Sequence, residues 1–321
     1  MKNRNNQMTL LTDEQIANIA HDYFLSKLNI AEISKKYNLS RYLIAKAIDE
    51  AEDKGIVKIS IYQSPKRAQN LEREFQKLFD LKEVYILEDK ETKNQDNEMI
   101  VNFAAKQIQN YITSANVVGL TWGTLLRDII DDFSTETRPD LTVVQLLGQV
   151  VNASKRKQPL IQHAADKFNA KSLTFPAPLY AIDPGLVKKI QQEPYYQYIE
   201  KYFSKLDLVF ASIGTMQSLE SGQFFMDHYA DKLFTGIKKN QLAGIIFGRP
   251  YDIKGRFYSP IEPHISGISL SDILAVPDRF VIVKNRFKED ALLGALRSGV
   301  ITHLITTSGI AERVLRKNEA L

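Results

Sequence analysis

A run of positive charge between Glu32 and Asp49 is the first set of side chains that could do chemistry. No acidic residue interrupts it, and its basic members are Lys35, Lys36, Arg41 and Lys46. Arginine is the usual reader of guanine in DNA, whereas lysine more often holds a phosphate. We predict that five residues of this stretch contact DNA: Lys36, Ser40, Arg41, Tyr42 and Lys46. The alternative is the solvated face of ordinary surface helices.

Two short helices joined by a tight turn would place these side chains on one surface. Asn38 falls in the turn, where the backbone must be left-handed and asparagine is the best substitute for glycine. Ser40 can cap the second helix, which has apolar residues at helical spacing on one face. Residues 55–61 form a turn and an alternating strand. The pattern predicts a helix-turn-helix with a wing, supported by an earlier helix that begins near Thr12.

A second candidate site lies at residues 119–124, where an apolar strand leads into a helix through a loop with two threonines and glycine at its turns. Free backbone N–H groups at the start of a helix attract anions, and glycine lets a phosphate approach closely. We predict an anion site that uses Gly119, Thr121, Trp122, Gly123 and Thr124. A tight strand-to-helix turn also needs glycine for steric reasons alone, so this alternative stays open.

Loops after other apolar runs supply further candidates for the same site. Lys288 begins a predicted helix, where its charge could reach a phosphate, although a solvated lysine is the plainer interpretation. Gly214 follows a second run, and Gln145 lies within a third. Asp252 is included as well, although its proline- and glycine-containing segment is more typical of a turn.

No catalytic or metal-binding set can be recognised in the sequence. The five histidines, at positions 21, 163, 228, 264 and 303, lack metal-ligand spacing, and no serine lies in a G-x-S-x-G elbow. Adjacent carboxylates such as Asp131 and Asp132 are typical of an exposed helix face. We predict no enzyme activity, no metal and no cofactor, while a catalytic pair of residues distant in sequence stays open.

The composition sets outer bounds on these functions. The chain has 321 residues, of which 44% are apolar and 25% charged, as in a globular protein of two domains. Its net charge is only +4, so DNA binding must come from a local patch. The absence of cysteine excludes disulfides and Cys-ligated zinc. No apolar run reaches membrane-spanning length and no secretory signal opens the chain, so we expect a cytoplasmic protein without membrane contact.

We predict two domains, residues 1–63 and 64–321. In the second, apolar runs alternate with helical stretches, and the runs are residues 84–87, 117–120, 143–146, 208–211, 280–283 and 304–306. Buried strands separated by helices indicate a parallel, doubly wound α/β sheet, which binds ligands beyond the carboxyl ends of its strands. A charged amphipathic helix at 67–79 is either a spacer or dimer contact, or a helix packed on its own domain.

With these residues in view, the chain resembles the SorC/DeoR family of bacterial transcriptional regulators from about residue 13 to residue 314. The resemblance rests on blocks in the same order: residues 33–41, 55–57, 118–124, 143–146, 248–255 and 291–307. It implies an N-terminal all-α winged helix-turn-helix that binds double-stranded operator DNA, and a phosphosugar-isomerase-like α/β domain for effector binding and oligomerisation. It also implies a homo-oligomer, a dimer or a tetramer, that responds to a phosphorylated sugar.

The same resemblance assigns the phosphate of that sugar to Thr121, Gly123 and Thr124, with Lys288 as their cationic partner. The sequence departs from the family's pattern around this site. The departures are Leu147 in place of a basic residue found in some members, Ile245 in place of a common acid, Leu125 in place of a second loop threonine, and Lys284 and Asn285 in place of the usual Gly-Gly. A Schiff base at position 147 is therefore excluded, and the sugar-contacting part is more apolar.

The function predicted from the sequence is a sequence-specific DNA-binding transcriptional regulator of a carbohydrate-utilisation operon, gated by a phosphorylated sugar. One alternative is a phosphosugar isomerase or deaminase with an added N-terminal domain, although no acid/base pair is recognisable. The other is a DNA-binding oligomer that responds to no ligand, which the substitutions Leu147, Ile245 and Leu125 motivate.

Overall fold

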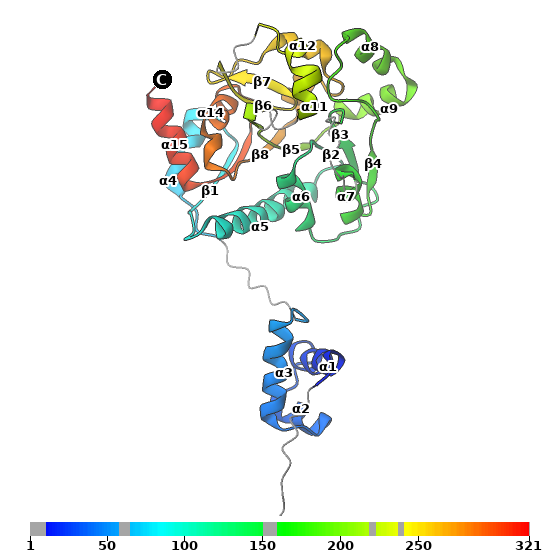
Figure 1. The fold of residues 1–321 in the computed structure, drawn as a ribbon, viewed down its shortest axis with the longest axis vertical. Helices are drawn as coiled ribbons and strands as arrows, with labels where there is room; N and C mark the ends of the chain where they lie inside the picture. The colour runs from blue at the N-terminus through cyan, green and yellow to red at the C-terminus, as the bar shows by residue number, and fades with distance from the viewer. Residues whose placement is uncertain (1–10, 58–64, 150–158, 218–222, 237–240, 321) are drawn as a thin grey trace, which may run out of the picture. The chain divides into compact units, whose positions relative to one another are not determined.

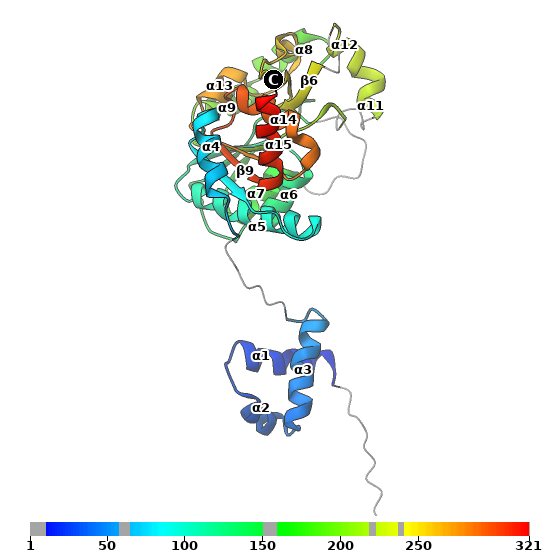
Figure 2. The ribbon, with the colours of Figure 1, turned by 90° about the vertical axis from the view of Figure 1, so that its left-hand side faces the viewer.

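Two compact units make up the chain, Met1–Gln63 and Ser64–Leu321, and each is described by itself. The computed structural model describes residues 11–57, 65–149, 159–217, 223–236 and 241–320. Figure 1 and Figure 2 show the helical N-terminal unit and the larger α/β unit in two views. The predicted DNA contacts belong to the first unit, and the predicted effector contacts belong to the second.

Three helices form the N-terminal unit: α1 (Asp13–Phe24), α2 (Ile30–Tyr37) and α3 (Arg41–Asp53). Apolar side chains from all three meet in one core, in which Ile33 and Ile44 are completely buried. Each helix begins at a side-chain cap, supplied by Thr12, Asn29 and Ser40. The caps satisfy N–H groups that have no partner inside the helix. The helical N-terminus predicted from the sequence is confirmed.

Only the start of the segment predicted as a wing lies within the described residues. After α3, Gly55 adopts a left-handed backbone with a φ of +69°. The N–H group of Val57 then donates to the carbonyl of Ala51 over 2.9 Å. Residues 58–61, which carry the predicted strand, lie outside the described residues. The wing therefore stays a prediction.

A sheet of seven parallel strands forms the centre of the C-terminal unit, in the order β1-β9-β8-β5-β2-β3-β4. The strands are β1 (Glu83–Leu87), β2 (Val117–Leu120), β3 (Thr142–Gln145), β4 (Lys171–Leu173), β5 (Leu208–Ser212), β8 (Asp278–Ile282) and β9 (His303–Thr307). All but β4 overlap the apolar runs. β4 has no such run because it is a three-residue edge strand that begins with the exposed Lys171.

Helices cover both faces of the sheet, which confirms the parallel, doubly wound arrangement. One face packs against α5 (Lys93–Ile112), α6 (Thr124–Asp131) and α7 (Leu160–Lys167), grouped along one side in Figure 1. The other face packs against α4 (Gln69–Phe79), α9 (Pro194–Phe203), α13 (Leu270–Ala275), α14 (Glu289–Arg297) and α15 (Ser308–Glu319).

Shorter elements complete the C-terminal unit. They are α8 (Pro184–Gln192), α11 (Gln223–Phe225), a π-helix (Met226–Ala230), α12 (Asp231–Leu233), β6 (Leu242–Ile246), β7 (Arg249–Asp252) and two 3₁₀ turns (Ser259–His264 and Arg286–Lys288). β6 and β7 form an antiparallel hairpin. Its turn residues, Phe247 and Gly248, both have positive φ, as two-residue hairpin turns favour.

The sequence left open whether the helix predicted at 67–79 is a spacer or dimer contact, or packs on its own domain. In the structure it packs on its own domain. Phe75 of α4 is completely buried in the core of the C-terminal unit. Arg67 donates two hydrogen bonds of 2.8 and 2.9 Å to the Glu72 carboxylate. That carboxylate also accepts the N–H group of Ile86 in β1 over 2.9 Å. These bonds tie the helix to the first strand.

A buried histidine lies at the start of β9. The ring of His303 stacks on Phe280, with 4.3 Å between the ring centres, and its Nε2 atom lies 3.2 Å from the Tyr111 hydroxyl. Burial lowers the pKa of His303 to about 4, because an imidazolium ion loses its hydration there. The ring is therefore neutral at physiological pH.

We predict that the C-terminal unit loses stability as the pH falls from 6.5 to 4. His303 takes up a proton near pH 6.5 in the unfolded chain and near pH 4 in the folded chain. The unfolded state then binds more protons in this window, so the free energy of unfolding decreases. Thermal unfolding across the window should show a shallower decrease for His303→Gln, and His21→Gln is the exposed control. Equal slopes for wild type and His303→Gln would contradict the prediction.

Candidate functional site

The turn between α2 and α3 has the geometry that the sequence predicts. Asn38 ends α2 with a left-handed backbone, at a φ of 53° and a ψ of 40°. The Oγ atom of Ser40 accepts the N–H group of Leu43 over 3.3 Å and so caps α3. A further contact comes from Ser34, whose hydroxyl donates to the Leu39 carbonyl over 2.6 Å. These bonds fix the direction in which α3 leaves α2.

A nearly buried carboxylate holds one of the predicted DNA contacts. Asp22 of α1 accepts bonds from the Lys36 ammonium at 2.7 Å and from the Tyr37 hydroxyl at 2.8 Å. The hydrogen bond from Lys36 is the main reason why the pKa of Asp22 is lowered. Lys36 thus joins α2 to α1 while its side chain stays 52% exposed. Sequence reasoning missed Asp22 because the pair is separated by 14 residues.

The remaining predicted DNA contacts lie together on the exposed surface of α3 and its cap. They are Ser40, Arg41, Tyr42 and Lys46, all exposed. Tyr42 keeps 74% of its surface accessible. Among the described residues, no carboxylate lies within ion-pair distance of Arg41 or Lys46. Both positive charges are therefore available to a polyanion.

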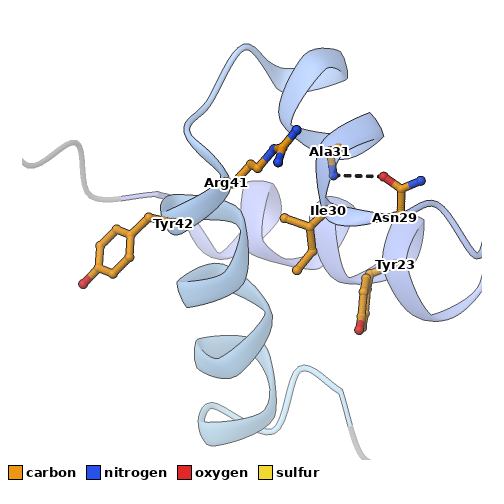
Figure 3. A pocket seen from close by; sticks show the side chains of 6 residues that line it. All are labelled: Tyr23, Asn29, Ile30, Ala31, Arg41 and Tyr42. Carbon is orange, nitrogen blue, oxygen red and sulfur yellow. Dashed lines mark hydrogen bonds between the residues drawn. The ribbon is translucent and has the colours of Figure 1, made fainter.

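An open hollow of about 650 Å³ lies beside the start of α3. It is lined by Tyr23, Asn29, Ile30, Ala31, Arg41 and Tyr42. Figure 3 shows the side chain of Arg41 directed toward the start of α2, whereas Tyr42 points away from it. Arg41 and Tyr42 would therefore contact different parts of a molecule bound at this surface.

The chain changes direction in the sheet between β2 and β5. From β2 it continues through β3 to β4 on one side, and it then returns to β5 on the other side and continues through β8 and β9. Loops diverge at such a point, and ligands bind there, beyond the carboxyl ends of the strands. The predicted anion-binding loop, which follows β2, lies at this point.

Gly123 brings the start of α6 close to the end of β5. Its φ is +147°, and no side chain of the described residues caps the helix. The first N–H groups of a helix have no partner inside it. A Cβ atom on Gly123 would lie 3.2 Å from the Ser212 hydroxyl. Thr124 is exposed at the helix start, whereas Thr121 is buried. Gly123 thus serves close packing and also leaves an uncapped helix start, the two roles considered from the sequence.

Lys288 reaches the same point from the β8 side. Its Nζ atom donates to the carbonyl of Ile213, the residue after β5, over 2.5 Å. Burial lowers the pKa of Lys288, and the nearby charge of Lys284 lowers it further. Among the described side chains, no carboxylate lies within ion-pair distance of Lys288. A partly buried ammonium group with no neighbouring carboxylate can bind an anionic ligand.

Lys284 is a second cation at this edge, and sequence reasoning did not include it in the site. Its Nζ atom lies 3.4 Å from a carboxylate oxygen of Asp128 in α6. The Lys284 side chain is 20% exposed and that of Asp128 is 49% exposed. No local signal could have found the pair, because 156 residues separate its members.

Several other predicted effector contacts are engaged within the protein. The Gln145 amide is buried and donates to the Leu147 carbonyl over 2.7 Å. Gly214 exchanges two backbone hydrogen bonds of 2.8 and 2.9 Å with Ile245. Gly119 is buried within β2, where a Cβ atom would collide with the Leu146 side chain. Each of these residues thus has a structural role of its own.

Asp252 occupies a turn, as its sequence surroundings indicate. Its carboxylate accepts the N–H groups of Lys254 and Arg256, at 2.9 and 3.0 Å, and the Arg256 guanidinium at 2.7 Å. The Asp252 carbonyl packs beside Gly294, in the second half of α14. Lys288 lies just before the first residue of that helix. The structure therefore does not bring Asp252 and Lys288 together.

The apolar substitutions noted in the sequence differ in where they lie. Leu147 and Leu125 are 2% and 7% exposed and belong to the two cores of the C-terminal unit. Ile245 is partly exposed. Of the three, Ile245 therefore offers the most surface to a ligand.

Two further histidines of the C-terminal unit have structural partners. His163 pairs with Asp131 at 2.5 Å, and the Nδ1 atom of His264 lies 2.8 Å from the Ala181 carbonyl. Among the described residues, no group of three or more His, Cys, Asp or Glu side chains could hold a metal ion. In the same part of the chain, no helix combines the length and apolarity needed to cross a bilayer.

The fold is that of a helical N-terminal unit followed by a doubly wound α/β unit with a candidate anion site at its strand ends. A comparison with known protein families identifies the family of this chain. The family model described as "Putative sugar-binding domain" matches residues 63–316, which is most of the chain. The chain belongs to this family.

Two relatives are similar along most of their length. The "Uncharacterized transcriptional regulator YjhU" of Escherichia coli strain K12 is 21% identical over 317 residues, which cover 96% of each chain. The "Deoxyribonucleoside regulator" of Bacillus subtilis strain 168 is 20% identical over 281 residues, 85% of this chain and 88% of the relative. Both relatives are named as regulators rather than as enzymes.

Solved structures share the fold. The full-length sorbitol operon regulator SorC from Klebsiella pneumoniae matches with a TM-score of 0.75 at 20% identity, covering 95% of this chain and 100% of that one. A transcriptional regulator from Streptococcus pneumoniae TIGR4 matches with a TM-score of 0.71 at 23% identity, covering 78% and 97%. The resemblance to the SorC/DeoR family is thereby confirmed.

We predict that Asp22→Asn opens the N-terminal unit about tenfold more often, because Lys36 and Tyr37 lose a charged acceptor in a nearly buried position. Amide hydrogen exchange in α1–α3 of the full chain measures this opening. Asp13→Asn is the matched control, since Asp13 is 76% exposed and its ion pair with Lys54 lies at the surface. Equal exchange rates in the two variants would refute the role assigned to Asp22.

Proposed function

We propose that this protein is a sequence-specific DNA-binding transcriptional regulator gated by a phosphorylated sugar. The observation that carries the proposal is the ammonium of Lys288. It is partly buried without a described carboxylate, and its acceptor Ile213 follows Ser212, which packs against the uncapped start of α6. Membership of a sugar-binding family and the regulator names of the relatives support the same function.

In this proposal the N-terminal unit, residues 1–63, is a winged helix-turn-helix that binds operator DNA. Its recognition helix is α3, whose first residues would enter the major groove. Arg41 and Lys46 support this role, because both are exposed and no described carboxylate lies within ion-pair distance of either. Lys36 would hold a phosphate through its exposed side, and the wing predicted at residues 55–61 belongs to the same proposal.

The C-terminal unit, residues 64–321, would bind the effector and form the dimer or tetramer. Gly123 and Thr124 would offer backbone and hydroxyl donors to the phosphate, while Lys284 and Lys288 would supply positive charge. Charge-assisted hydrogen bonds of this kind are among the strongest that a protein makes to an anion. The phosphosugar-isomerase-like character of this unit belongs to the same proposal.

Gating would follow from a difference in effector affinity between two conformations of the oligomer. One conformation would place its recognition helices on two operator half-sites, and the other would not. The target would be a carbohydrate-utilisation operon, and the protein would act in the cytoplasm. The proposal does not require catalysis by the C-terminal unit.

We predict that Arg41→Ala reduces the preference for the operator over scrambled DNA roughly tenfold, because a base contact is lost. Lys46→Ala should instead weaken both complexes about equally, because a phosphate contact carries no sequence information. Competition binding with an operator selected from genomic fragments measures both effects. Lys201→Ala, in α9 of the other unit, is the control. An unchanged preference in Arg41→Ala would refute its assignment as a base reader.

We predict that the fluorescence of Trp122, the single tryptophan of the chain, reports effector binding beside Gly123. A phosphorylated sugar should change it, whereas the matched free sugar should not. Lys288→Met should weaken binding about tenfold or more, because a charged donor is lost, and Lys201→Met should not. If a broad panel of sugar phosphates gives no response while DNA binding is intact, the ligand-independent oligomer becomes the better interpretation.

A further inference from the structure

We propose that the exposed face of α9 pairs antiparallel with α9 of a second copy of this chain, about a two-fold axis near the middle of the helix. The pairing rests on the proposed function, in which the C-terminal unit forms a dimer or tetramer, and it names the surface that makes the contact. Its support is a cluster of lysines and tyrosines at the end of α9 and an exposed carboxylate at the start of the same helix.

The lysine–tyrosine cluster, which consists of Lys171, Tyr198, Tyr202 and Lys205, joins the edge strand β4 to α9. The Lys171 ammonium donates to the Tyr198 hydroxyl over 2.5 Å and to the Tyr202 hydroxyl over 3.3 Å. The two hydroxyls lie 3.3 Å apart. The Nζ atom of Lys205, just beyond α9, lies 5.5 Å from the centre of the Tyr202 ring. Figure 1 shows α9 and β4 along the same margin of the C-terminal unit.

The positive charge of this cluster has no acidic partner in the part of the chain that the structure describes. Neither Lys171 nor Lys205 has a described carboxylate within ion-pair distance. The hydrogen bond from Lys171 is the main reason why the pKa of Tyr198 is lowered, and the charge of Lys205 contributes to the same shift. Such a shift indicates an excess of positive charge around the hydroxyl. The cluster therefore favours a negatively charged partner.

The chemistry of the cluster favours a carboxylate over a nucleic-acid base. The Lys171 ammonium lies 5.0 Å from the centre of the Tyr198 ring and 5.4 Å from that of Tyr202. Because a lysine already covers these ring faces, they are not free to stack on a base. The phenol hydroxyls and the ammonium can still donate hydrogen bonds, and a carboxylate only accepts them.

Glu193 offers such a carboxylate at the opposite end of α9. It is the N-cap residue, it is exposed, and no described basic side chain lies within ion-pair distance of it. Glu193 lies six residues before Ile199 and Lys205 lies six residues after it, roughly 9 Å along the helix axis in each direction. An antiparallel second copy of α9 would therefore bring Glu193 to Lys205 of that copy, and symmetry would repeat the contact.

The same register places aromatic rings at the centre of the contact. Tyr195 would face Tyr202 of the second copy, and Tyr198 would lie near the axis, where it meets its own counterpart. Tyr195 is 53% exposed and Tyr198 is 41% exposed. Exposed aromatic residues surrounded by charges suit an interface, and a two-fold contact requires a self-complementary surface of this kind.

The neighbouring helix α8 extends this surface. A stable interface buries about 800 Å² on each partner, which is more than one short helix offers. Helix α8 packs against α9, and its Leu186 is exposed. An apolar side chain at this position adds area that association removes from water.

Charge reversal tests the pairing by sedimentation equilibrium of the full chain. Glu193→Lys and Lys205→Glu should each raise the dissociation constant of the contact about tenfold or more, because each variant creates two like-charge pairs. An equal mixture of the two variants should regain the wild-type affinity, since every facing pair in the mixed dimer is again a lysine and a glutamate. Lys77→Glu is the matched control, because this exposed lysine lies on α4, beside the opposite edge strand β1.

A single cysteine reports the two-fold axis directly, because the chain has no cysteine of its own. Tyr198→Cys, close to the axis, should give a disulfide-linked dimer under mild oxidation, whereas Lys77→Cys should not. Thermal unfolding of each variant shows whether a loss of association reflects a loss of fold.

Three results would overturn the pairing. If the protein is oligomeric but neither reversal changes its mass and residue 198 forms no cross-link, another surface makes the oligomer and the proposed function stands. If the reversals weaken association and the mixture does not restore it, or if they lower only the melting temperature, the two charges act within one chain, on the dipole of α9. A protein that stays monomeric at every concentration would overturn the pairing and the oligomer of the proposed function together.

Discussion

The parallel pairing of β2 with β5 is the constraint on which the candidate effector site depends. Gly119 lies opposite Val209 and Leu120 opposite Phe210, so the two strands end at the same edge of the sheet. Their onward connections run to opposite sides, which separates the loops that follow. The contact between Gly123 and Ser212 follows from this register.

Two buried arginines stabilise other parts of the C-terminal unit. Arg249 donates two hydrogen bonds of 2.6 Å to the Glu262 carboxylate and also binds two backbone carbonyls. Arg279, the second residue of β8, donates to four backbone carbonyls at the end of α13 and after α13 and α14, and desolvation lowers its pKa. A buried guanidinium is tolerated when its donors are satisfied in this way. Lys288 differs, because its ammonium has one described acceptor and no described carboxylate.

Short-range patterns explain which features could be predicted from the sequence. The left-handed Asn38, the cap at Ser40 and the strands of the seven-stranded sheet other than β4 depend on residues within a few positions of one another. Periodicity or capping chemistry reveals them. β4 and the β6–β7 hairpin escaped prediction because a three-residue edge strand and a tight hairpin provide too little periodic signal. Gln145 and Asp252 were plausible ligands from their position alone, since the sequence does not show which bonds they already make.

The sequence by itself determined the helical N-terminal unit, the alternation of strands and helices, and the loop that leads into α6. Only the tertiary structure decided which side chains meet. Lys36 binds Asp22 across 14 residues, Lys288 binds the Ile213 carbonyl across 75, and Lys284 approaches Asp128 across 156. The physical reason is that these contacts depend on helix packing and on the order of the strands, which local periodicity does not specify.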